Sequence, residues 1–385
     1  MQTSPRETPK VVQLELWPLE YVIPRERAYG QARGLNFRRS CGLFMVTTDQ
    51  GVVGYGEAAA PLKALSAYVE IVRPFFLGRS IFDGEIIAAE IYNRFYHFGV
   101  QNHLTTTLGG LSIALVDAAG KSLGVPAHDL LGGRATSVLP CYATTGYFTT
   151  NDARDYEPQL IAAKGNFAGV KIKCGASPAS DVARVQLARR VLGDDVLLMV
   201  DINGNYTVDI ALESLRRIEP YNIHWCEEPL PPTDLRGYAE LRARSPIPIA
   251  ASEALYTVHD FKRLVDASGV DVLQPSLTRC GGIGQAKAIA QLAHVNNLRL
   301  SPGVWGSPIA VAAAVHFAAS LPITPHTDNV PYPLLIEYDV AENPMRDRML
   351  KTPMELKNGA LTVPTGPGLG IEIDEAAVRE FLVKL

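Results

Sequence analysis

The pattern of hydrophobic and polar positions divides the chain into two parts near residue 135. In the first part, residues 11–58 are rich in β-branched and aromatic residues. Two apolar runs within Leu43–Tyr55 are joined by Asp49-Gln50-Gly51, which predicts a β-hairpin. From residue 62 to residue 131 the pattern becomes helical, because Leu108–Gly120 carries apolar residues at helical spacing before Gly124-Val125-Pro126 ends it. We therefore expect a sheet followed by helices in the first third of the chain.

After residue 135, short apolar runs alternate with stretches that are each long enough for one amphipathic helix. The eight runs are Leu139–Ala143, Gly169–Lys173, Val196–Ile202, Ile223–Glu227, Ile247–Ser252, Val270–Gln274, Leu298–Ser301 and Leu334–Glu337. Eight short strands that alternate with helices over about 200 residues predict a (β/α) barrel of the α/β class. A doubly wound open sheet is the competing fold, but neither a GxGxxG nor a Walker A motif follows any of these runs.

The composition is that of an ordinary globular protein, with 47% hydrophobic residues, 20% charged residues and a formal net charge of −4. Because no polybasic face is implied, neither nucleic acid nor an anionic membrane is an expected partner. The N-terminal segment lacks the apolar centre of a signal peptide, and the apolar stretch Ile309–Ser320 is short enough to predict a packed helix instead of a membrane span. The five cysteines form no CxxC pair, which favours reduced thiols in a cytoplasmic protein.

Three acidic residues each end a predicted strand of the barrel: Asp201, Glu227 and Glu253. Successive members are 26 residues apart, about the length of one βα unit, so their side chains should return to the same rim of the barrel. Three carboxylates that converge there would repel one another without a cation, and hard oxygen ligands select Mg²⁺. The alternative is that each residue caps the following helix, which explains one such residue better than three at equal spacing.

Two lysines share one face of an earlier predicted strand, because Lys171 and Lys173 are two residues apart. At a separation of about 6–7 Å and an effective dielectric near 20, their repulsion is roughly 2–3 kcal/mol, or about 2 pKa units. We therefore expect one of the two lysines to be neutral enough near neutral pH to act as a base.

A set of short motifs makes the chain resemble a known family. The motifs are GVKIK, VDINGNY, WCEEP, ASEA, QPSLTRCGGI and the GPGLG of the C-terminal tail. On these motifs the chain resembles the enolase superfamily, and within it the mandelate racemase subgroup, over nearly its whole length. The resemblance implies a modified TIM barrel, (β/α)7β, with an α+β capping domain. The expected division is a capping domain at residues 1–135, a barrel at 136–345 and a C-terminal segment at 346–385 that returns to the capping domain.

The resemblance also implies a shared first step and a role for individual residues. In this family Mg²⁺ binds the carboxylate of a small-molecule substrate while a base removes the α-proton to give an enediolate. By match to the motifs, Lys173 is the expected base and Lys171 its neighbour. Glu337 matches an acid that hydrogen-bonds the substrate carboxylate, and Asn203 matches a polar residue that touches the substrate. A homo-oligomer is expected from the resemblance alone.

The chain departs from the family pattern at the position of a second base. The subgroup usually carries a His after the seventh strand and an Asp after the sixth, but this chain has Gly303 and Ser276 there. With one face of the site empty, a two-base racemisation is disfavoured, whereas a syn β-elimination or the opening of a lactone or anhydro ring needs groups on one face only. We therefore expect a lyase (dehydratase) or a cycloisomerase that acts on a hydroxylated acid such as an acid sugar.

Several residues could still serve the second face, and two other functions stay open. The candidates are Tyr147, Trp305 and His326, whereas His316 is expected to pack in a helix and His224 to lie in the core of the barrel. If one of the candidates acts as a second base, the protein could be a racemase or epimerase. A catalytically silent relative that only binds a ligand is the other alternative.

The sequence says little about which substrate the protein binds. Tyr29, Arg33, Arg38 and Arg39 lie in a polar segment before the hairpin, where they could contact an anionic or polyhydroxylated substrate or could simply be surface charges. Asp117 and Lys121, four residues apart on a predicted helix, are interpreted as a structural pair.

Overall fold

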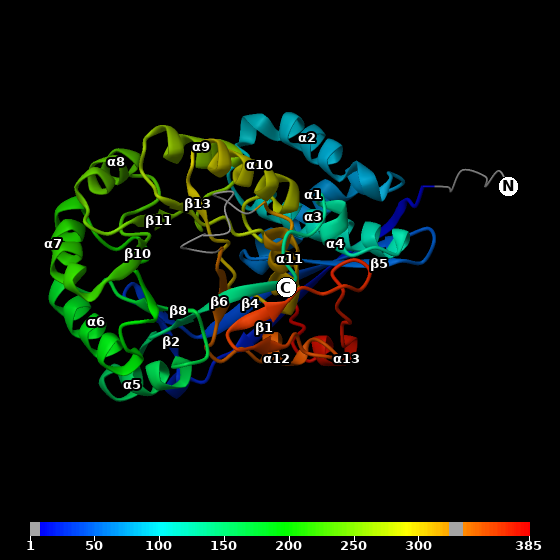
Figure 1. The fold of residues 1–385 in the computed structure, drawn as a ribbon. Coiled ribbons are helices and arrows are strands. Elements are labelled where there is room, and N and C mark those ends of the chain that lie inside the picture. Colours follow the sequence, from blue (N-terminus) through cyan, green and yellow to red (C-terminus); the bar gives the residue numbers. More distant parts are fainter. Residues whose placement is uncertain (1–7, 323–333) are drawn as a thin grey trace.

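The protein is described by a computed structural model that covers residues 8–322 and 334–385 (Figure 1). The first part of the chain is an antiparallel sheet packed against helices. The sheet has the order β1-β4-β5, from strands Val11–Val22, Arg38–Thr48 and Val53–Ala58, and its β4–β5 turn is the predicted hairpin. The helices are α1 (Leu62–Phe76), α2 (Gly84–Phe95), α3 (His103–Leu123) and α4 (Ala127–Leu130).

The long helix α3 lies directly on β5, and two glycines make this close approach possible. A Cβ added at Gly54 would lie 2.1 Å from the carbonyl oxygen of Ala114, and one at Gly56 would lie 2.0 Å from that of Gly110. The helix ends at Gly124, which adopts the left-handed conformation that suits a helix C-terminus. The helical pattern that predicted this segment is thus confirmed.

The second part is a barrel of parallel strands with helices on its outside (Figure 1). Its eight strands are β6 (Val138–Thr145), β8 (Gly169–Lys173), β9 (Leu197–Asp201), β10 (Ile223–Glu227), β11 (Ile249–Ala251), β12 (Val272–Leu273), β13 (Arg299–Leu300) and β14 (Ile336–Asp339). They match the eight predicted runs, so the predicted barrel is confirmed. Seven longer helices alternate with them: α5 (Asp152–Ala163), α6 (Pro178–Leu192), α7 (Val208–Ile218), α8 (Leu235–Arg244), α9 (Val258–Asp266), α10 (Gly282–Val295) and α11 (Pro308–Ala319).

The strands follow one another around the barrel in chain order. Each of β6 and β8–β12 pairs in parallel with the next barrel strand, and β14 closes back on β6 through the register Ile336↔Cys141 to Asp339↔Thr144. Between β13 and β14 the described residues form no ladder, and Ser301 Oγ donates to the carbonyl oxygen of Leu335 at 2.9 Å instead. All carboxyl ends of the strands therefore face one rim.

The C-terminal segment leaves the barrel and returns to the first domain. The amide of Glu20 on β1 donates to the carbonyl oxygen of Phe381, and the buried carboxylate of Asp117 on α3 accepts from the amide of Leu369. Lys121 pairs with the same carboxylate at 2.6 Å, as the spacing of the two residues predicted. These contacts support the three-part division at residues 135 and 345, which we retain as a proposal.

Three smaller expectations concern the cysteines, membrane-spanning helices and the apolar stretch that begins at Ile309. All five cysteines are buried and unpaired, as their spacing predicted. In the described ranges, no helix is both long and apolar enough to cross a membrane. The apolar stretch that begins at Ile309 is the buried helix α11.

Candidate active site at the barrel mouth

Strand β8 places two lysines inside the mouth of the barrel. Lys171 and Lys173 are 1% and 7% exposed, and each faces carboxylates on neighbouring strands. Lys171 Nζ lies 2.6 Å from Glu227 Oε1, 3.0 Å from Glu337 Oε1 and 3.9 Å from Asp201 Oδ2. Lys173 Nζ lies 2.5 Å from Asp201 Oδ2. The alternation of the strand thus brings both ammonium groups to the same rim, as predicted.

The prediction that one of the two lysines is neutral near neutral pH is wrong for the protein without a bound cation. Although burial lowers the pKa of Lys173, the charges of Asp201, Glu253 and Glu227 together outweigh it and raise this pKa above the usual value. The pKa of Lys171 is likewise raised, because burial is outweighed by Glu227 and Glu337. The sequence argument counted the repulsion between the lysines and a nearby cation, but it left out the carboxylates that contact them.

The three predicted metal ligands lie in one charged cluster, but their carboxylates do not converge on one point as the ligands of a metal ion would. Asp201 ends β9 and Glu227 ends β10, whereas Glu253 follows β11 in a loop. Burial raises the pKa of Glu227 to about 8, with further increases from Asp201, Glu337 and Glu253. Among the described residues, no three acidic, histidine or cysteine side chains are close enough together to hold a metal ion.

The donor atoms nonetheless fit a hard divalent cation. All three side chains offer carboxylate oxygens, and Asn203 Oδ1 is a buried oxygen that no protein group satisfies. The backbone amide of Asn203 donates to Asp201 Oδ1 at 2.9 Å, so this residue lies against the first of the three carboxylates. Asn203 adopts a positive φ of 53°, a strained conformation that is often found at functional sites.

Two polar residues that the sequence reasoning missed complete this sector. Burial and the charges of Glu253 and Asp201 hold the pKa of Glu228 well above its usual range. Glu228 follows Glu227 and should face away from the mouth, but its φ of 39° breaks the alternation of the strand. Gln274 Nε2 donates to Glu227 Oε2 at 2.5 Å. The doubled acid in WCEEP was the available signal for Glu228.

Glu337 is held firmly by the barrel itself. Its Oε1 accepts from Thr144 Oγ1 at 2.5 Å and contacts Lys171, and its Oε2 accepts from the backbone amide of Val304 at 2.7 Å. These contacts place Glu337 at the mouth and make it a partner of Lys171. Its expected hydrogen bond to a substrate carboxylate stays a prediction.

A second polar cluster lies where the capping domain meets the rim. Tyr147 OH, beyond the end of β6, donates to Asp339 Oδ1 at 2.7 Å and accepts from Trp305 Nε1 at 3.1 Å. Arg39 of the capping domain binds Asp339 Oδ2 at 2.5 Å and lies 3.9 Å above the ring of Trp305. Arg39 also donates to Tyr29 OH at 2.8 Å. Lys173 Nζ lies 5.7 Å from the ring centre of Tyr147, so this cluster adjoins the lysines.

Asp339 is the member of this second cluster that the sequence reasoning missed. It lies two residues beyond Glu337 on the same strand, so strand alternation could have placed it on the same face. Its contact with Arg39 joins residues 300 positions apart in the sequence, and no local pattern predicts such a pair.

The opposite sector of the mouth contains the two positions where the family dyad is missing. Ser276 Oγ contacts only Thr278 Oγ1, at 3.1 Å, among the described side chains. A Cβ added at Gly303 would lie 3.6 Å from Glu337 Oε2, so a side chain there would point toward the lysine and carboxylate cluster. Gly303 thus lies beside Glu337, and neither Gly303 nor Ser276 itself supplies an acid or a base at the two positions of the family pattern.

The remaining histidines lie away from this mouth or beyond the described residues. His326 lies outside the described part of the chain. His316 is buried in α11, where its Nδ1 lies 3.0 Å from Nδ1 of His128. His224 begins β10, at the opposite end from Glu227, and lies 3.4 Å from Arg299. The packing interpretation of His316 and His224 is consistent with these positions.

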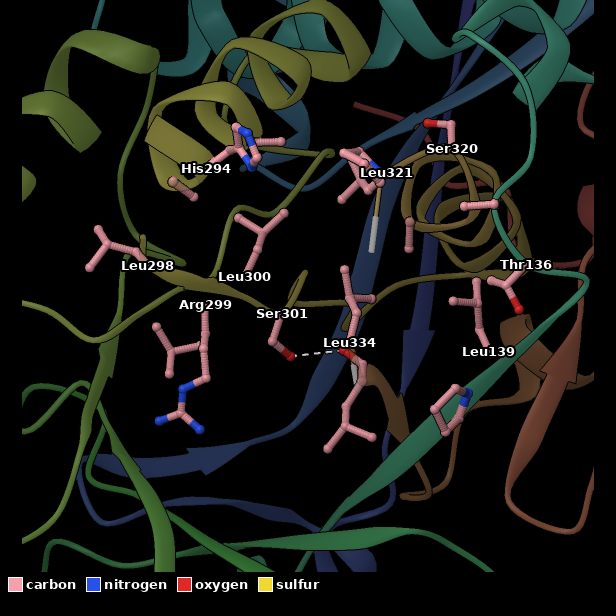
Figure 2. A pocket seen from close by; sticks show the side chains of 18 of the residues that line it. Thr136, Leu139, His294, Leu298, Arg299, Leu300, Ser301, Ser320, Leu321 and Leu334 are labelled. Atoms are coloured by element: carbon pink, nitrogen blue, oxygen red, sulfur yellow. Dashed lines mark hydrogen bonds between the residues drawn. The ribbon is translucent and has the colours of Figure 1, made fainter. Parts of the chain in front are cut away.

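A cavity of about 630 Å³ lies at that opposite end of the barrel (Figure 2). Its lining comes from the first residues of several barrel strands, including Leu139, Leu298, Arg299 and Leu334. None of the predicted metal ligands or lysines lines it. The barrel fold and the charged rim therefore point to the mouth, and not to this cavity, as the candidate active site.

Two family models cover most of the chain. The model of the mandelate racemase/muconate lactonizing enzyme N-terminal domain matches residues 28–132, and the enolase C-terminal domain-like model matches residues 155–377. The chain belongs to the enolase superfamily, of the mandelate racemase/muconate lactonizing enzyme type.

Characterised members of this superfamily with similar sequences are dehydratases and cycloisomerases. The chain is 36% identical to a D-galactarolactone cycloisomerase from Agrobacterium fabrum, over 89% of this chain and 92% of the relative. It is 33% identical to an arabinonate dehydratase from Saccharolobus solfataricus, over 88% of this chain and 90% of the relative. This protein is thus a member of an enzyme family whose relatives include dehydratases and cycloisomerases.

Solved structures show the same architecture. A 3,6-anhydro-D-galactonate cycloisomerase from Zobellia galactanivorans superposes with a TM-score of 0.88 at 31% identity, covering 97% of this chain and 100% of that chain. A racemase from Streptomyces coelicolor with bound magnesium superposes with a TM-score of 0.84 at 26% identity, covering 97% of this chain and 100% of that chain. The predicted modified TIM barrel with its capping domain is confirmed by these matches.

Proposed function

We propose that this protein is a Mg²⁺-dependent enzyme that removes the α-proton of a hydroxylated carboxylic acid and then expels the oxygen on the β-carbon. The expelled group is either a hydroxyl, which gives a dehydratase, or a ring oxygen, which gives a ring-opening cycloisomerase. The observation that carries this proposal is the asymmetry of the mouth. Both lysines and the carboxylates occupy one sector, whereas Ser276 and Gly303 supply no acid or base opposite them.

Lys173 is the proposed base. In the protein alone Asp201 and the neighbouring carboxylates hold the pKa of Lys173 above its usual value, so this role requires that a cation bound at Asp201 offset their charge. Its Nζ reaches Asp201 at the rim and is the more exposed of the two ammonium groups, at 7% against 1% for Lys171. Lys171 is held from two sides by Glu227 and Glu337, which suits a fixed positive charge that orients the substrate carboxylate. Asp201, Glu227 and Glu253 would hold Mg²⁺, and Asn203 would contact the substrate beside them.

The bound Mg²⁺ supplies positive charge that stabilises the negative charge that develops on the substrate when the proton leaves. Lys173 takes the α-proton on Nζ, and the electron pair of the broken C–H bond forms the new double bond. The C–O bond at the β-carbon then breaks, and its electron pair stays on the leaving oxygen. A leaving hydroxyl or ether oxygen needs a proton, which the protonated Lys173 can return from the same face.

Racemisation is the second candidate function, and one observation speaks for it. Tyr147 and Trp305 bring a hydroxyl and an indole N–H to the rim next to Lys173. Tyr147 lies next to Lys173 and the indole N–H of Trp305 donates to the Tyr147 hydroxyl, so we assign neither group to the opposite face that a two-base route requires. A catalytically silent protein is disfavoured because burial of six ionisable side chains at one mouth costs free energy that a binding-only site would not need; these are Lys171, Lys173, Asp201, Glu227, Glu228 and Glu337.

The test is to incubate the protein with Mg²⁺ and a panel of acid sugars and their lactones in D₂O. We expect uptake of deuterium at the α-carbon together with formation of a dehydrated or ring-opened product. Deuterium uptake with inversion but without loss of the β-oxygen would show a racemase. No uptake on any acid of the panel, with or without Mg²⁺, would contradict the proposed chemistry.

A further inference from the structure

Three arginines of one capping segment have different environments in the structure. Arg38 lies on the surface, with its side chain 64% exposed, and pairs with Glu20 at 2.6 Å. Arg39 is 2% exposed and its charge is matched by Asp339. Arg33 reaches the barrel rim and forms no ion pair with a carboxylate in the described ranges.

The position of Arg33 is fixed by the strands that carry it. It lies in the turn between β2 (Tyr29–Gln31) and β3 (Gly34–Asn36). Strand β2 also pairs with β7 (Phe148–Thr149), which immediately follows the first barrel strand, through Tyr29↔Thr149 and Gly30↔Phe148. The capping hairpin is thereby joined to the rim of the barrel by backbone hydrogen bonds.

The guanidinium of Arg33 lies beside the predicted metal and substrate residues. Its Nη1 is 3.4 Å from the carbonyl oxygen of Asn203, two residues beyond Asp201. At the next residue, Gly204, an added Cβ would lie 3.5 Å from the same Nη1, so the guanidinium also packs against this glycine. The buried Asn203 Oδ1 that lacks a protein partner lies on the same residue.

From this arrangement we infer that Arg33 binds a second carboxylate at the far end of the substrate. The inference rests on the proposed function, in which the first carboxylate lies at the metal and lysine cluster. A guanidinium without an acidic partner favours a planar anion that accepts two parallel hydrogen bonds. The substrate class is then a dicarboxylic acid sugar or its monolactone. In the lactone, the breaking C–O bond leaves its electron pair on the ring oxygen, so Arg33 would meet the carboxylate that ring opening releases.

The test compares two acids that differ only at the far end. Galactarate carries a carboxylate there and galactonate carries a primary alcohol; galactaro-1,4-lactone tests the ring-opening form. We expect Arg33→Ala to lower kcat/KM for galactarate or its lactone by about 10- to 100-fold, the usual range for a charge-assisted hydrogen bond, and to change kcat/KM for galactonate by less than about threefold. Arg33→Lys should recover part of the loss, mainly in KM.

Arg38→Ala is the matched control, because it removes an arginine five residues away that pairs with Glu20 instead of reaching the rim. It should leave kcat/KM unchanged for both acids. An equal effect of Arg33→Ala on the two acids would overturn the inference while leaving the proposed chemistry intact. A kcat/KM of the wild-type protein that is higher for galactonate than for galactarate would also overturn the inference.

Binding provides an answer that does not depend on turnover. With Mg²⁺ present, calorimetry should give a lower Kd for galactarate than for galactonate in the wild-type protein, and Arg33→Ala should remove that difference. The difference should also shrink as NaCl is raised, because Arg33 is exposed and its charge is screened. Equal Kd values for the two acids in the wild-type protein would contradict the role of Arg33, whether or not either acid is turned over.

Discussion

The two sides of the barrel mouth differ sharply in charge. On the side formed by β8, β9 and β10, Lys171 and Lys173 contact Asp201 and Glu227 at distances between 2.5 and 3.9 Å. On the side that follows β12 and β13, the matching positions are Ser276 and Gly303, and the only side-chain hydrogen bond described for Ser276 is to Thr278. Parallel barrel strands carry both sides, and the difference in charge comes from the residues at and after their carboxyl ends.

This difference separates the proposed first step, which is proton removal, from the step that follows it, which is elimination or inversion. The charged side contains what proton removal next to a carboxylate requires: a base, fixed positive charge and oxygen ligands for a cation. On the neutral side, the described residues Ser276 and Gly303 supply no acid or base. We therefore assign the first chemical step to the charged side, and the neutral side favours elimination over inversion.

The largest expected effect comes from removing the base on the charged side. Lys173→Ala should lower turnover by about 10³-fold or more, because general base catalysis contributes roughly 10²–10⁴-fold. It should also abolish deuterium exchange at the α-carbon. Exchange is measured by NMR in D₂O on the best substrate of the panel.

Two further variants separate loss of the base from loss of the fold. Lys173→Arg keeps a positive charge next to Asp201 but cannot lose its proton near neutral pH, so it should fold and remain inactive. Lys164→Ala, at an exposed position beyond α5, should behave like the wild-type protein. Wild-type exchange rates in both Lys173 variants would show that another group is the base.

The second effect tests whether the charged side holds a cation. EDTA should lower the melting temperature by a few °C and Mg²⁺ should restore it, since a ligand at 100 times its Kd stabilises the folded state by about 2.7 kcal/mol. Glu253→Gln should weaken this response, because Glu253 is a proposed ligand that forms no ion pair in the described ranges. Glu355→Gln, an exposed acid far from the rim, is the control. A melting temperature that is insensitive to EDTA and Mg²⁺ would remove the metal from the proposal.

The charged side was largely predictable from the sequence, and the reason is periodicity. Asp201 and Glu227 end β9 and β10 as expected, and the alternation of β8 turns both lysines inward. Glu253 was assigned to a strand end, but β11 stops at Ala251 and Ser252 adopts a φ of 104°, so Glu253 lies in a loop. Hydrophobic runs locate strands well but their last residues poorly.

The contacts between the capping domain and the barrel were not predictable from the sequence, because they depend on how the capping domain docks on the barrel. Arg39 meets Asp339 and Trp305 only in the folded chain, and a polar segment before a hairpin does not specify those partners. The lysine pKa values were misjudged for a related reason. Strand spacing gives the distance between the two lysines, but it does not give the carboxylates from other strands that contact them.

A smaller effect should separate proton removal from loss of the leaving group. Tyr147→Phe removes the hydroxyl that links Trp305 to Asp339 next to Lys173, and the loss of one or two hydrogen bonds should slow product formation by about tenfold. Deuterium exchange at the α-carbon should persist. Tyr55→Phe also removes a hydroxyl that donates to a carboxylate, that of Glu375, but it lies on β5 of the capping domain and should have no effect. Equal slowing of exchange and product formation would place Tyr147 in the first step instead.

The smallest expected effect is a gain of function on the neutral side. Gly303 does not require a positive φ, and a Cβ there would make an ordinary van der Waals contact of 3.6 Å with Glu337 Oε2, so the backbone accepts a side chain at this position. The double variant Ser276→Asp, Gly303→His would rebuild an acid and a base opposite Lys173, and we expect slow inversion at the α-carbon that the wild-type protein lacks. The measurement is recovery of the epimeric acid in D₂O by chiral chromatography. Gly303→His with Ser276 unchanged should invert more slowly, since position 276 then supplies no carboxylate to orient the imidazole. If the wild-type protein already inverts its substrate at the rate of the double variant, a second proton donor exists on the neutral side, and the contrast between the two sides of the mouth does not decide the reaction.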